Sequence, residues 1–146
     1  MSEPSVALVV VTSIAGGLVM FAGIFAGTLW LIAAVGWARL ARTHAASGPT
    51  PAGQSFAPRL VFVGPVRYRG GAVRFVCGPG ALVLEAHPIF RLMHRPIALS
   101  YAVLSVEPAE QGFVRVRIAG SDVALRLQAG AWREIELART AGQPAP

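Results

Sequence analysis

Apolar and polar positions are arranged differently in the two parts of this chain. From Pro4 through Ala38 no side chain is charged, and most positions are apolar. After Arg59, apolar residues come in short alternating runs that glycine and proline interrupt. A bilayer core requires about 20 apolar residues in a helix, and a period of two is typical of half-buried strands. The pattern therefore predicts one transmembrane helix followed by a small β-domain.

The uncharged run predicts a single span, because no polar turn divides it into two. A helix over the whole run would be about 52 Å long against a core of about 30 Å, so we expect it to tilt or to project. Trp30, Trp37, Arg39 and Arg42 are expected to be interfacial anchors. Glu3 is the only charged side chain before the span. The positive-inside rule then predicts an outside N-terminus and a cytoplasmic C-terminal domain on a bacterial inner membrane.

Small residues are predicted to line one face of this helix. At about 100° per residue they fall within about 20° of one line, with bulky side chains opposite. These positions are Gly16, Gly23, Gly27 and Ala34. Small residues let helix backbones approach closely in lipid, although glycine is also common in transmembrane helices in general. We expect this face to pack on other membrane-protein subunits or on a second copy of the chain.

The β-region is expected to hold one small domain between a linker and a tail. Residues 1–43 are interpreted as the anchor and its flanks, 44–58 as a Pro- and Gly-rich linker, 59–140 as the β-domain and 141–146 as a disordered tail. Strands are predicted near residues 59–68, 72–77, 80–86, 89–94, 97–107, 112–119 and 122–128, with a short helix near 129–140. Such a series predicts a small all-β antiparallel barrel or sandwich with a C-terminal helix.

Residues 80–108 resemble the middle of small bacterial PH-like or GRAM-like domains. The resemblance is carried by Gly80, Phe90, the turn His94-Arg95-Pro96 and Ile97, while Ser100-Tyr101 stands where Pro-Trp is typical. It implies a barrel that the terminal helix closes at one end. It also implies binding of lipid headgroups or proteins rather than catalysis.

The charged residues are basic in excess. All 13 basic side chains are arginine, and the net charge is +6. Six of them are expected to form a basic face of the β-domain, or else an ordinary solvated β-surface: Arg59, Arg67, Arg69, Arg74, Arg91 and Arg95. Anionic lipid is nearer to a tethered domain than nucleic acid, which is not an expected partner.

Residues able to carry chemistry are few. Cys77, Glu85, His87 and His94 do not have the spacing of a zinc site, which needs three or four converging ligands, so neither metal nor cofactor is expected. The serines have no assigned His and Asp partners, so the chain is not expected to be an enzyme. A lone cysteine excludes an internal disulfide and fits a reducing compartment.

Three functions remain open. The first is a non-catalytic accessory subunit of a larger membrane complex, such as a photosynthetic or respiratory assembly, by architectural analogy with the reaction-centre H-type subunit. Its helix would pack on partner helices and its β-domain would brace the complex. The second is a membrane-anchored PH-like adaptor for anionic lipid headgroups or a cytoplasmic protein. The third and least supported is an enzyme or transporter component with an unrecognised site.

Overall fold

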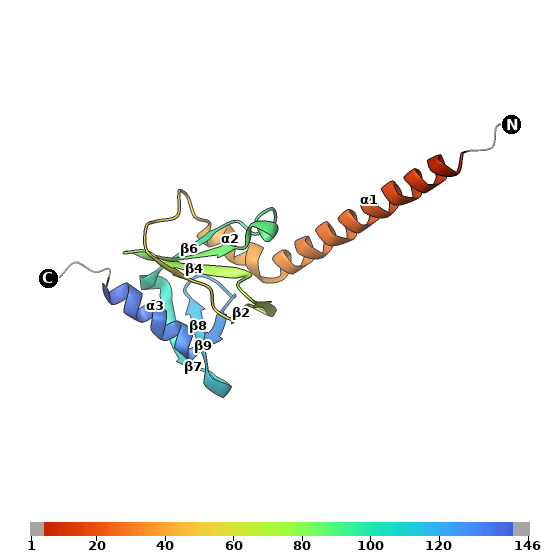
Figure 1. The fold of residues 1–146 in the computed structure, drawn as a ribbon. Helices are drawn as coiled ribbons and strands as arrows, with labels where there is room; N and C mark the ends of the chain where they lie inside the picture. Colours follow the sequence, from red (N-terminus) through yellow and green to blue (C-terminus); the bar gives the residue numbers. More distant parts are fainter. Residues whose placement is uncertain (1–4, 142–146) are drawn as a thin grey trace.

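The computed structural model describes residues 5–141 and begins with one long helix. This helix comprises α1 (Val6–Ile32), a π-helical turn η1 (Ala33–Trp37) and α2 (Ala38–His44). Ser5 caps its start by accepting a hydrogen bond from the Leu8 amide. Figure 1 shows α1 projecting away from the β-domain, so its apolar side chains are exposed over most of their length. The helix is long and apolar enough to cross a membrane, as the sequence predicts.

The β-domain consists of two antiparallel sheets, three short 3₁₀ turns and a terminal helix. The first sheet has the order β1 (Gln54–Phe56), β4 (Val73–Cys77), β5 (Ala81–Ala86) and β6 (Ile97–Ser100). The second has the order β3 (Val66–Arg69), β2 (Leu60–Val63), β9 (Leu125–Gln128), β8 (Phe113–Ile118) and β7 (Leu104–Pro108). The turns are η2 (Pro88–Phe90), η3 (Tyr101–Val103) and η4 (Glu110–Gly112), and the terminal helix is α3 (Ala129–Ala141).

Both sheets contribute side chains to a single apolar core. Alternation along β8 and β9 buries Val116, Ile118, Leu125 and Leu127, and the neighbouring arginines face solvent. Helix α3 packs on the core through Trp132, Ile135 and Ala138, which are spaced along one helical face. The sheets do not join into a closed barrel in the described part of the chain. A PH-like barrel is therefore not confirmed, whereas the spanning-type helix, the antiparallel β-domain and the short C-terminal helix are.

The long helix continues into the core of the β-domain. Trp37 and Leu40 have no exposed surface. The Trp37 indole Nε1 donates a hydrogen bond to the Arg95 carbonyl at 2.7 Å, and its ring packs edge-on against Tyr68 and His94. At Gly36 the helix touches the β2 backbone so closely that an added Cβ would lie 3.2 Å from the Val63 carbonyl carbon and nearer still to its oxygen. The helix and the β-domain therefore share one core.

This contact corrects two expectations. Trp37 is not an interfacial anchor, because its side chain is enclosed by protein and cannot reach lipid headgroups. The predicted linker over residues 44–58 belongs to the domain: Ala45 pairs with Ile97, β1 pairs with β4, and the Thr50 hydroxyl bonds to Glu85.

Several strand predictions were too long. The predicted strand 59–68 is a hairpin, because Gly64 adopts a positive φ of 59° and turns the chain before β3. Residues 89–94 form turns instead of a strand, starting at Pro88. The predicted strand 97–107 divides between the two sheets at η3, where Ser100 accepts a bond from the Ala102 amide. Of the predicted tail, Ala141 ends α3 and residues 142–146 lie outside the described part.

Candidate interaction surface

The solvent face of the five-stranded sheet carries one continuous cross-strand row. Register places Arg67 opposite Phe62, Phe62 opposite Arg126, Arg126 opposite Arg115, and Arg115 opposite Glu107. The row therefore crosses all five strands of the sheet. We call this surface the arginine face and define it by Arg67, Arg69, Arg115, Arg117 and Arg126.

Two aromatic rings organise the guanidinium groups of the arginine face. The Arg126 guanidinium carbon lies 4.7 Å from the Phe62 ring centroid and 5.9 Å from that of Phe113. Arg67 approaches the same Phe62 ring at 6.0 Å from the neighbouring strand β3. The Phe62 and Phe113 rings meet edge-on at 6.1 Å. Cation–π contacts of this kind limit the side-chain freedom of arginine, so its charges are partly preorganised for a ligand.

Positive charge on the arginine face is largely uncompensated by its own chain. Arg115 and Arg126 lie directly opposite each other, an arrangement that like charges make unfavourable. Within residues 5–141, the ion pair on this face joins Arg117 Nε to Glu107 Oε2 at 3.0 Å. Glu107 and Glu110 line one hollow with Arg115 and Arg126, but the arginines outnumber these carboxylates on the face, so it is suited to an anionic partner that would relieve the repulsion.

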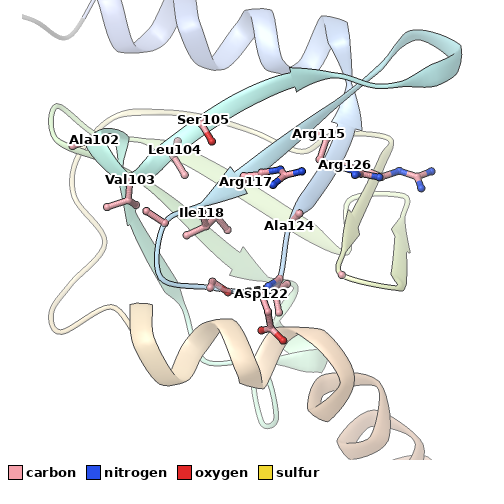
Figure 2. Close-up of a pocket in the computed structure, with 14 residues that line it drawn as sticks. Ala102, Val103, Leu104, Ser105, Arg115, Arg117, Ile118, Asp122, Ala124 and Arg126 are labelled. Atoms are coloured by element: carbon pink, nitrogen blue, oxygen red, sulfur yellow. Dashed lines mark hydrogen bonds between the residues drawn. The ribbon is translucent and has the colours of Figure 1, made fainter.

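A hollow of about 770 Å³ opens at the edge of the arginine face. Figure 2 shows Arg115, Arg117 and Arg126 gathered on one side of it, with Asp122 on the side nearer the long N-terminal helix, which is drawn in pale orange. Gly64 and residues 102–105, 118–119 and 121–124 form its other walls. Asp122 is already paired with Arg39, so the hollow keeps an excess of positive charge. Guanidinium groups bind carboxylate and phosphate oxygens in a bidentate manner, and this chemistry suits recognition of an acidic surface.

The predicted basic residues do not form one face. Arg67 and Arg69 lie on the arginine face, but Arg74 and Arg91 lie at the other sheet and both contact Glu85, at 2.8 and 3.6 Å. Arg95 lies beside the long helix, and the Arg59 carbonyl accepts a bond from the Gly70 amide at the β3–β4 turn. The single-face expectation was wrong because β3 and β4 belong to different sheets.

Sequence reasoning missed Arg115, Arg117 and Arg126 as members of this surface. The alternation Phe113-Val-Arg-Val-Arg-Ile118 already placed two of them on a solvent face. What it lacked was the pairing of β9 with β2, which brings Arg126 beside Phe62.

Titratable groups with shifted pKa values lie in packing contacts away from the hollow. Bonds from Thr50 and Arg74 lower the pKa of Glu85. Burial lowers the pKa of His94, and burial raises the pKa of Tyr101 to about 12. His87 caps the η2 turn. Across residues 5–141 no three metal-ligating side chains of His, Cys, Asp or Glu gather.

The remaining predicted sites lie along the helix. Apart from the helix's own backbone, no atom comes within 4 Å of a Cβ built on Gly16, Gly23 or Gly27, so this face is open in the described chain. Ala34 instead lines a groove between the helix and the residues after η2. Trp30 is exposed at that groove, Arg42 also lines it, and Arg39 pairs with Asp122. The anchoring role of Trp30, Arg39 and Arg42 stays a prediction.

Comparison with protein-family models, curated proteins and solved structures finds no match to this chain.

Proposed function

We propose that the chain is a non-catalytic, single-span accessory subunit of a larger membrane complex. A photosynthetic or respiratory assembly has the required architecture. In this role the small-residue face of α1 packs on partner helices. The β-domain stands on the cytoplasmic side and braces the complex through the arginine face.

The observation that carries this proposal is the shared core of helix and β-domain. Trp37 and Leu40 are completely buried, and Gly36 touches the β2 backbone. A tethered adaptor benefits from a flexible linker that lets its domain search for a ligand. A brace instead needs a fixed angle between its membrane part and its cytoplasmic part, and a helix enclosed by the β-domain supplies one.

Two surfaces support the proposal further. The open glycines on α1 allow close approach of another helix, which lipid alone does not reward. The arginine face, with its facing Arg115 and Arg126, suits an acidic protein surface. The groups with shifted pKa values serve packing, and the described lining of the hollow holds no acid–base pair.

The alternative is a membrane-anchored adaptor whose arginine face binds anionic lipid headgroups. It is favoured by the uncompensated arginines, since each basic residue near an anionic leaflet contributes about 1 kcal/mol. The two functions differ in what co-purifies with the full chain. Stoichiometric protein subunits in mild detergent support the accessory subunit, and lipid retention without protein supports the adaptor.

The test is a native pull-down with mass spectrometry on two double variants. Gly23→Leu with Gly27→Leu overpacks the open helix face, which costs about 1–3 kcal/mol per site in a packed interface. Insertion should be unaffected, because leucine is favourable in hydrocarbon. We expect normal membrane levels of the variant and loss of the partner subunits.

Phe21→Leu with Phe25→Leu is the matched control, since both rings lie on the bulky side and stack on each other. These changes should leave the partner bound. Equal retention of partners by both double variants would show that the glycines reflect composition alone, and the accessory role would lose its helix contact.

A further inference from the structure

The turn after β5 presents apolar side chains to the outside of the β-domain. We call residues 87–93 the apolar turn. Leu92 is 81% exposed and Ile89 58%, and both lie in a segment of turns between β5 and β6. Exposed aliphatic side chains grouped on one projection are typical of surfaces that bind an apolar phase or partner.

Backbone hydrogen bonds and the buried His94 ring fix the conformation of the apolar turn. The Phe90 amide donates to the His87 carbonyl at 2.8 Å, and the Met93 and His94 amides both donate to the Phe90 carbonyl at 3.1 Å. The buried His94 ring lies with Nε2 3.0 Å from the Tyr68 hydroxyl and packs against Trp37. The exposed side chains of the turn are thus fixed relative to the long helix through Trp37.

The apolar turn lies beside the end of the spanning helix. A groove of about 500 Å³ separates the two, with Trp30 and Ala34 on the helix side and Leu92 and Met93 on the turn side. Figure 1 shows this green segment next to the place where α1 meets the domain. The first charged residue after the span, Arg39, lies only nine positions beyond Trp30. At about 1.5 Å per residue, this is about 13 Å along the helix, so the groove lies close to the end of the uncharged span.

The charges around the groove have one sign. Arg42 and Arg95 line it, and within the described chain no acidic residue does. Arg91 adjoins Leu92 in sequence and contacts Glu85 on its other side. An apolar projection bordered by arginines matches the layering of a bilayer surface, where acyl chains lie beneath phosphates.

We propose that the apolar turn inserts into the interfacial region of the same bilayer that α1 spans, with Arg42 and Arg95 on lipid phosphates. The occupant is lipid because the groove adjoins the end of the spanning helix and the charges that line it, Arg42 and Arg95, complement lipid phosphates. An apolar side chain held beside the end of the span would lie at the acyl–headgroup boundary. The β-domain then has two membrane contacts, which determine how it is oriented on the surface.

The experiment uses the purified full chain in vesicles of phosphatidylethanolamine and phosphatidylglycerol. Cys77 is replaced by alanine, and an environment-sensitive fluorophore is attached at Leu92→Cys. The control label is at Leu137→Cys, an exposed position on α3. Spin-labelled lipids measure contact with acyl chains, and aqueous iodide measures exposure to water.

We expect lipid quenching at position 92 to exceed that at position 137 severalfold, with the opposite order for iodide. Adding Arg42→Gln and Arg95→Gln should reduce lipid quenching at position 92. Equal iodide quenching at both positions would overturn the proposal. A label at 92 that neither lipid nor iodide quenches would also overturn it, because a second copy of the chain would then cover the turn.

Discussion

Replacing Gly36 by alanine tests whether the long helix and the β-domain form one rigid unit. An added Cβ would lie 3.2 Å from the Val63 carbonyl carbon and closer to its oxygen, and both are backbone atoms of a paired strand. The helix must therefore move away by roughly 1 Å, and a gap of about 0.5–1 Å removes about a quarter to a half of the dispersion attraction between the atoms it separates. Trp37 and Leu40, which follow directly, would be packed less tightly on the core.

Two opposing effects determine how much Gly36→Ala changes the free energy of unfolding. Overpacking a filled site costs about 1–3 kcal/mol, and the better helix propensity of alanine returns up to about 1 kcal/mol. We expect Gly36→Ala to lower the free energy of unfolding of the β-domain by about 1–2 kcal/mol. Urea titration in mild detergent, followed by near-ultraviolet circular dichroism of the aromatic core, measures this quantity.

Gly27→Ala is the control, because no atom lies within 4 Å of a Cβ built there. It should leave the free energy of unfolding unchanged or slightly raise it. If Gly36→Ala were as harmless as Gly27→Ala, the helix would not be seated on β2, and the rigid brace would be refuted.

Three further predictions concern the whole chain. A soluble fragment beginning at Ala33 should melt cooperatively when followed by circular dichroism, whereas one beginning at Phe56 should be far less stable. The second fragment lacks Trp37 and Leu40, and loss of a buried tryptophan or leucine costs about 2–5 kcal/mol each. Equal melting temperatures for the two fragments would contradict the shared core. Burial lowers the pKa of His94, so the unfolded chain binds its proton more readily. Stability should therefore fall as pH drops below about 6.5, and His94→Gln should flatten that dependence in urea titrations. A reporter active only in the cytoplasm, fused after Pro146, should give signal, and a signal from a periplasmic reporter instead would reverse the orientation.

Local patterns predicted the parts of the fold that depend on neighbouring residues. The uncharged run to Ala38 predicted the helix, and the alternation over residues 113–118 predicted β8 and its buried face. Gly70 and Gly120 are among the glycines that interrupt the alternating runs, and both adopt a positive φ at a turn.

Long-range pairing explains what the sequence could not show. A tryptophan at the end of an apolar run has the same sequence signature in a headgroup zone as in a protein core, so Trp37 was assigned to the former. The arginine face depends on β9 pairing with β2, and most of the domain's sequence lies between these two strands. No local periodicity carries that information, because register between distant strands is set by the fold as a whole.

Because the helix is continuous, the number of residues between Gly27 and Gly36 determines the rotation about the helix axis that separates the open glycines from the contact with β2. Each α-helical residue rotates the chain by about 100° and advances it by about 1.5 Å. One residue inserted between Thr28 and Ile32 would leave hydropathy and span length nearly unchanged. It would nevertheless swing the open glycines about a quarter of a turn around the helix axis relative to the arginine face. Four inserted residues would restore their bearing to within about 40°. The number of residues in this short segment therefore fixes the direction in which the open glycines point relative to the arginine face.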